Sequence, residues 1–62
     1  MDLRLEFYTH ERKLAVQSLS GTLAEAKKIA REGMAAHSAR HVVMIELKRN
    51  KIIGMVHCDA LD

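Results

Sequence analysis

Two neighbouring apolar segments in the second half of the chain constrain its fold more than any other feature. Residues 42–47 (VVMIEL) and residues 52–58 (IIGMVHC) are joined by the polar turn of residues 48–51. A strand with one solvent-facing side alternates apolar and polar residues, whereas these two segments are apolar on both sides. The pattern predicts a hairpin whose two faces must both be covered.

Alternation along the hairpin divides its apolar side chains into two sets. The set assigned to the intramolecular core comprises Val43, Ile45, Leu47, Ile53 and Met55. The opposite set comprises Val42, Met44, Ile52 and Val56. Because the chain has one good helix, and one helix covers one face of a sheet, the second set is predicted to form an interface with a second copy or another protein.

Chain length makes such an interface attractive. At 62 residues the chain is one small domain, residues 1–62. A single core of this size rarely contributes more than about 3–5 kcal/mol, so small domains often rely on disulfides, metals or partners. With one cysteine, Cys58, an internal disulfide is excluded. A metal, a partner or a marginal core remains.

The first half of the chain supplies two further strands and the helix. Residues 3–8 alternate apolar and polar side chains, residues 9–13 are polar, and residues 14–19 form a weaker apolar segment, which together predict a hairpin. Thr22 and Glu25 have the spacing of a capping box, which predicts a helix start. The helix is expected to end near residues 36–38. Its buried stripe is predicted to comprise Leu23, Ala26, Ile29, Ala30, Gly33, Met34 and His37.

The expected fold class is therefore α+β: a two-layer ββαββ domain with one helix packed on a four-stranded, mostly antiparallel sheet. The predicted core comprises Leu3, Leu5, Phe7, Leu14, Val16, Leu23, Ile29, Met34, Val43, Ile45, Leu47, Ile53 and Met55.

Residues 22–26 (TLAEA) and 30–31 (AR) are followed by an apolar strand, a short polar turn and another apolar strand. In this arrangement the chain resembles small bacterial domains of unknown function with a ββαββ layout. Such families often have Asp-Gly or Asn-Gly in the last turn, where this chain has Asn50-Lys51. The resemblance implies a fold and no activity.

The basic turn between the last two strands is a candidate anion site. Tracing the strand directions places Lys48, Arg49 and Lys51 at the same end of the sheet as Thr22 and the helix N-terminus, whose free amides attract anions. The alternative is a solvated turn that keeps a sheet edge soluble, because Glu25 already occupies local amides. Nucleic-acid binding has weak support from a net charge of +2.

The opposite end of the sheet gathers His10, His37, His41 and His57. His37 and His41 have the spacing of helical metal ligands, and imidazole with the Cys58 thiolate suits zinc. Neighbouring strand residues such as His57 and Cys58 point to opposite faces, which argues against a shared ion or a nucleophile–base pair. We expect no metal, no cofactor and no enzymatic activity; the alternative to a zinc site is a partly buried His37 with three surface histidines.

The sequence therefore predicts an interaction module that forms a homodimer or docks on a protein partner. The alternative is a small nucleic-acid or anion-binding module. Charges in residues 1–6 argue against a signal peptide, and no segment approaches the roughly 20 apolar residues of a membrane span. A cytoplasmic location with no membrane contact is expected.

Overall fold

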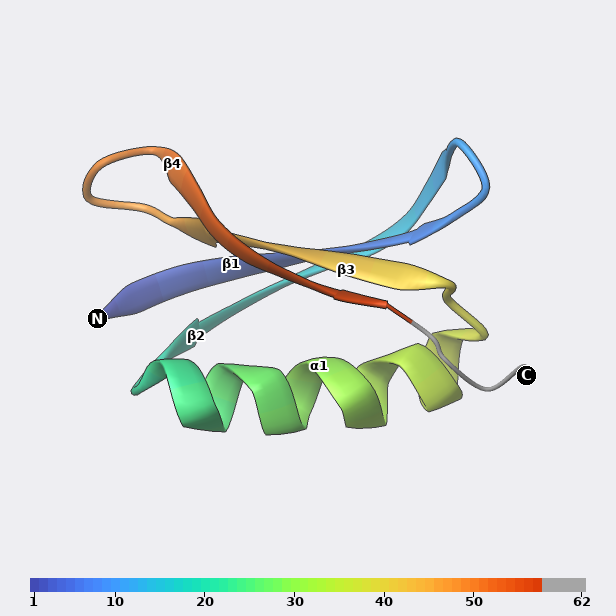
Figure 1. The fold of residues 1–62 in the computed structure, drawn as a ribbon, viewed down its shortest axis with the longest axis horizontal. Helices are drawn as coiled ribbons and strands as arrows, with labels where there is room; N and C mark the ends of the chain where they lie inside the picture. Colours follow the sequence, from blue (N-terminus) through green and yellow to red (C-terminus); the bar gives the residue numbers. More distant parts are fainter. Residues whose placement is uncertain (58–62) are drawn as a thin grey trace.

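The computed structural model describes residues 1–57 and has the predicted ββαββ order. Strands β1 (Asp2–Thr9) and β2 (Arg12–Ser20) form the first hairpin, and helix α1 (Leu23–His37) follows. Strands β3 (His41–Glu46) and β4 (Lys51–His57) form the second hairpin (Figure 1). Each predicted element is present, and its ends lie within a few residues of those expected.

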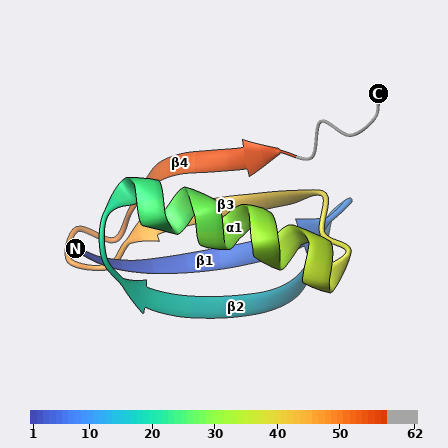
Figure 2. The same cartoon turned by 90° about the horizontal axis from the view of Figure 1, so that it is seen from below.

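The sheet has the strand order β2-β1-β3-β4, and every neighbouring pair is antiparallel. Helix α1 lies across one face of this sheet, in front of β1 and β3 in the view of Figure 2. No element of residues 1–57 covers the other face, and both hairpin turns bend away from the helix (Figure 1). We call this uncovered side the open face.

The sequence around the helix explains where α1 begins and ends. Glu25 donates its backbone N–H to Oγ1 of Thr22 at 3.2 Å, and Thr22 donates its backbone N–H to Oε1 of Glu25 at 2.8 Å. The predicted capping box is therefore confirmed. At the other end Ser38 adopts a left-handed conformation with φ of 57° and donates its N–H to the Met34 carbonyl. Among residues 1–57, no helix has the length and apolar character needed to cross a membrane.

The alternation of β1 decides which side of the sheet meets the helix. Leu3, Leu5 and Phe7 are fully buried under α1. Leu5 pairs with Met44 and Phe7 pairs with Val42 on β3. Because paired residues in an antiparallel ladder share a face, Met44 and Val42 also face the helix, and both are fully buried.

The two faces of the second hairpin were therefore assigned the wrong way round from the sequence. Three of the residues expected on a free face, Val42, Met44 and Val56, belong to the core under α1. Only Ile52 of that set is exposed. Met55, expected in the core, is on the open face.

The physical reason is that both sides of β3 are apolar, so its own sequence does not select the side facing the helix. Pairing with β1, a distant segment, makes that selection. A register shift between Met44 and Ile45 then leaves Ile53 unpaired, and Ile53 packs against the core although Ile52 does not.

The expected core is also wrong at Leu14 and Val16 on β2 and at Leu47 after β3, which are 38%, 50% and 39% exposed. On β2 it is Ala15 and Leu19 that pack against the core instead. Val43 is half-buried, and Ile45 is buried but lies outside the cluster under the helix. The correctly predicted members of that cluster are Leu3, Leu5, Phe7 and Met34, with Leu23, Ile29 and Ile53 packed against it.

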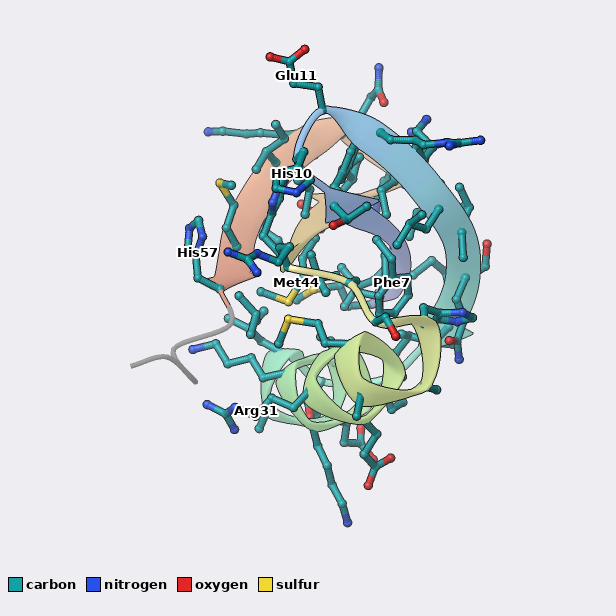
Figure 3. All side chains as sticks on the ribbon, turned by 90° about the vertical axis from the view of Figure 1, so that its right-hand side faces the viewer. Phe7, His10, Glu11, Arg31, Met44 and His57 are labelled. Carbon is teal, nitrogen blue, oxygen red and sulfur yellow. The ribbon has the colours of Figure 1, made fainter. Side chains whose placement is uncertain are left out.

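Two glycines create room for the largest core side chains. A Cβ atom at Gly33 on α1 would overlap the ring of Phe7, and one at Gly54 on β4 would lie 2.7 Å from the terminal methyl of Met44. Figure 3 shows Phe7 and Met44 pointing into the space between sheet and helix. The missing side chain at Gly33 therefore lets the helix approach the sheet closely, and the one at Gly54 leaves room for Met44 on the neighbouring strand.

Candidate interaction surface

Three rows of cross-strand neighbours build the open face. Each row takes one residue from β2, β1, β3 and β4 in turn. The first row is Ser18, Arg4, Ile45 and Ile52; the second is Val16, Glu6, Val43 and Met55; the third is Lys13, Tyr8, His41 and His57.

The β3 and β4 side of this face carries an apolar patch formed by Val43, Ile45, Ile52 and Met55. Ile52 is 59% exposed and Met55 is 48% exposed. On the far strand β2, Val16 adds a third apolar side chain that is half exposed. Contiguous apolar surface of this kind marks interaction sites more often than isolated exposed residues do.

The open-face residues of β1, Arg4, Glu6 and Tyr8, form a polar strip that separates the apolar patch from Val16. Its centre is Glu6, which is 9% exposed and accepts a hydrogen bond from the Tyr8 hydroxyl at 2.8 Å. Oε2 of Glu6 lies 3.1 Å from Nε of Arg4 and 3.7 Å from Nζ of Lys13. Arg4 Nε is buried and makes no hydrogen bond, so its contact with Glu6 is electrostatic attraction without good hydrogen-bond geometry.

The charges of this polar strip affect how easily another molecule could cover the open face. A buried charge is costly unless it is paired. Glu6 already has its partners within the chain, so a molecule that covers the strip need not supply a countercharge for it.

Three members of the third row, Tyr8, His41 and His57, have rings that lie next to one another. The rings of Tyr8 and His41 are stacked, with centroids 5.1 Å apart and planes 5° apart. The centroid of the His57 ring lies 5.9 Å from that of His41. The hydrogen bond to Glu6 is the main cause that raises the pKa of Tyr8 above its usual 10.0, because ionised tyrosine could no longer donate to the carboxylate.

The other two histidines lie elsewhere. The His37 ring on α1 is 5.1 Å from the Phe7 ring, but His37 is exposed, so the prediction that it is partly buried in the helix stripe is wrong. His10 occupies the turn of the first hairpin. Within residues 1–57, no three or more His, Cys, Asp or Glu side chains are arranged to hold a metal ion. Cys58, considered as a zinc ligand, lies outside the described residues.

The basic turn has the predicted position along the sheet but not the predicted surroundings. Lys48, Arg49 and Lys51 are exposed at the end of the sheet where α1 begins. The turn rises on the open side, however, whereas Thr22 and the helix N-terminus lie on the covered side (Figure 1). Arg49 also has an acidic neighbour, since its Nε is 3.7 Å from Oε1 of Glu46.

The capping box occupies part of the expected anion site as well. The Glu25 carboxylate accepts the Thr22 amide, and this hydrogen bond is the main cause that lowers the pKa of Glu25 below its usual value. Sequence reasoning therefore placed the cations at the correct end but did not foresee their separation from the helix.

Val16, Val43, Ile45 and Met55 are the interface candidates that sequence reasoning missed. The signal that could have found them is the strict alternation of β1, because Arg4, Glu6 and Tyr8 identify the uncovered side. Each strand paired with β1 inherits that side through its register.

Comparison with known proteins adds no relative from which a role could be carried over. A scan against protein-family models, a search of curated proteins and a search of solved structures each gave no match to this chain.

Proposed function

We propose that this chain is a protein-interaction module that forms a homodimer through the open face of its sheet. The observation that carries the proposal is the exposure of Val16, Ile52 and Met55 on the one face that α1 leaves uncovered. Covering these side chains removes apolar surface from water, which is the main favourable contribution to association.

The area of an ordinary interface can be compared with the total surface of this chain. A stable interface buries roughly 800 Å² on each partner. The chain exposes 4277 Å² in total, so a dimer would bury roughly a fifth of it. An area of that size is a large share of the surface of so small a chain.

A second copy suits the charges of this face. The carboxylate of Glu6 is balanced inside the chain by Arg4 and Lys13, so the polar strip does not demand a strongly charged partner. A dimer would also compensate for the small core that 62 residues can build.

Sedimentation velocity from about 1 μM to about 1 mM tests the proposal, since that range covers dissociation constants typical of weak to moderate dimers. We expect the mass to rise from 7.0 kDa to twice that value. Ile52→Glu and Val16→Glu should each shift the chain towards the monomer, because each buries a carboxylate in the interface.

Ala35→Glu is the matched control. It introduces the same charge at an exposed position of α1, on the opposite side of the molecule, and should leave the dimer unchanged. A wild-type chain that stays monomeric at the highest concentration would refute the proposal, as would equal effects of Ile52→Glu and Ala35→Glu.

A second candidate, binding of nucleic acid or another polyanion, is favoured by the three exposed cations Lys48, Arg49 and Lys51. Binding through them would weaken steeply with salt, because each neutralised phosphate releases counterions. Titration of a single-stranded oligonucleotide at low salt, with Lys48→Glu as the variant and Lys28→Glu as the control, tests it. No binding by the wild-type chain would refute this candidate.

A further inference from the structure

We infer that the free edge of β4, together with the groove between β4 and α1, binds an extended acidic segment of a partner protein by strand addition. In this mode an incoming strand hydrogen-bonds to an exposed sheet edge, and neighbouring pockets select its side chains. This site borders the open face, with which it shares Met55 and His57, and its proposed occupant goes beyond self-association.

The backbone of β4 has a side that no strand of residues 1–57 occupies, because β4 is last in the order β2-β1-β3-β4. Its final stretch is regular: the residues from Gly54 to His57 pair in sequence with β3, beyond the register shift. A regular edge can accept another strand, whereas a bulged edge resists one.

The other edge of the sheet, β2, has similar protection. Both edge strands begin with basic residues, Arg12 and Lys13 on β2 and Lys51 on β4, and both contain a register shift. Charged side chains and bulges are the usual means of blocking an edge, so they do not distinguish the two. The feature that distinguishes β4 is the groove beside its regular stretch.

This groove runs beside the edge of β4. It has a volume of about 280 Å³ and is lined by Lys27 and Arg31 of α1 and by Met55, Val56 and His57 of β4. Figure 3 shows His57 at this edge of the sheet and Arg31 on the helix, on the same side of the molecule. The lining residues of β4 are those of its regular stretch.

The charges of the groove identify the kind of partner. Lys27 and Arg31 form no ion pair with an acidic side chain of residues 1–57. The ion pairs among these residues join Glu6 and Glu46 to other cations. Two cations beside an apolar strand edge are complementary to carboxylates on the incoming strand.

The spacing of these cations makes the inference more specific. Lys27 and Arg31 are four residues apart on the helix, which is a rise of about 6 Å. Alternate residues of an extended strand are separated by about 6.6 Å and point to the same side. An incoming strand with acidic residues at positions i and i+2 can therefore place one carboxylate near each cation.

A second copy of β4 does not have these properties. Strand β4 has Lys51 at one end, His57 at the other and no carboxylate between them. Within the residues of β4, antiparallel pairing of two copies would bring no carboxylate to Lys27 and Arg31. We therefore assign the groove to a strand of another protein, and the test distinguishes that strand from a second copy.

The probe for the test is a capped peptide of about nine residues, the upper range of ordinary strand length, in which valine and glutamate alternate. We expect it to bind the full chain, to shift the amide resonances of β4 and to slow their hydrogen exchange. The double variant Lys27→Glu/Arg31→Glu should weaken binding at least about tenfold, as expected when attraction is replaced by like-charge repulsion.

Three controls distinguish this mode from general attraction. Lys28→Glu changes charge on the same helix outside the groove and should alter the affinity less than about twofold, as rim charges do. A peptide with lysine in place of glutamate should not bind. A peptide whose backbone amides are N-methylated along the side that faces β4 should also fail to bind, because it cannot form hydrogen bonds with the edge.

Several results would overturn the inference: no binding of the glutamate peptide at about 1 mM, which is weaker than useful recognition; equal binding of the N-methylated peptide; or no effect of the double charge reversal. Dimerisation of Val16→Glu, whose open face is disrupted at a residue outside the groove, in competition with the peptide would assign the edge to a second copy and would overturn the inference as well.

Discussion

The two sides of β3 and β4 present similar residues to different surroundings. Met44 on β3 is fully buried under α1, whereas Met55 on β4 is 48% exposed on the open face. The side chains are chemically identical, so their difference arises from position alone. An apolar residue becomes core because of what its paired strand and the helix place around it, and the leftover apolar side is available for a partner.

The sharpest way to break this comparison is the same substitution on both faces. Met44→Ala should reduce the free energy of unfolding by about 2–5 kcal/mol, because it leaves a cavity in a closed core. Met55→Ala removes contacts that are already half in water and should cost about 1 kcal/mol or less. Urea unfolding followed by circular dichroism measures both, at concentrations low enough to keep the chain monomeric.

Two outcomes of this experiment are informative. A Met44→Ala chain that is already unfolded without urea, beside a folded Met55→Ala chain, agrees with the comparison, since the whole domain has only a few kcal/mol of stability. Equal losses from the two substitutions would show that the open face is as well packed as the covered one.

The close approach of helix and sheet on the covered side gives a second, smaller effect. Alanine favours helix over glycine by about 1 kcal/mol, so propensity alone predicts that Gly33→Ala is stabilising. The added methyl would overlap the ring of Phe7, which is held in a closed core. Overpacking of this kind costs about 1–3 kcal/mol, and we expect a net loss of up to about 2 kcal/mol.

Matched variants separate packing from propensity at this position. Ala35→Gly, at an exposed position of the same helix, should also destabilise, by about 1 kcal/mol. In a Phe7→Leu background the Gly33→Ala substitution should become neutral or stabilising, because the smaller side chain removes the overlap. A stabilising Gly33→Ala in the wild-type chain would contradict the proposed contact.

The elements that the sequence predicted correctly are those specified by local chemistry. The capping pair Thr22 and Glu25 determines the start of α1, and the apolar spacing along the helix identifies the side that packs on the sheet. The strict alternation of Leu3, Leu5 and Phe7 identifies the covered side of β1 in the same way.

What could not be predicted depends on contacts between distant segments. Pairing with β1 determines which side of β3 faces the helix. A register shift between β3 and β4 determines the covered side of β4, and no residue type in the sequence predicts that shift. The position of the basic turn along the sheet follows from counting strand reversals, but its rise away from the helix follows from the bending of the hairpin (Figure 1). The sequence therefore predicted an uncovered, apolar sheet face, but it assigned most of the residues of the second hairpin to the wrong side of the sheet.

The smallest expected effect concerns the polar strip, where the open face differs most from the covered one. The Tyr8 hydroxyl donates to Glu6, which raises the pKa of the tyrosine above 10.0. Glu6→Gln should lower that pKa, because the amide bears no negative charge to oppose the tyrosinate while Arg4 still attracts it. The near-ultraviolet absorbance of tyrosinate measures this directly, since the chain has one tyrosine and no tryptophan.

The same contact predicts a dependence of stability on alkaline pH. A group whose pKa is raised by folding stabilises the folded state below its ordinary pKa, and this contribution is lost as the pH rises through the raised value. Between pH 10.0 and that value the wild-type chain should lose stability, and Glu6→Gln should lose less over the same interval. Glu46→Gln, which removes a carboxylate that pairs with Arg49 instead, is the control and should leave the titration of Tyr8 unchanged. Identical titrations of the wild type and Glu6→Gln would mean that Glu6 and Tyr8 do not interact in solution, and the polar strip would then lack the contact described between them.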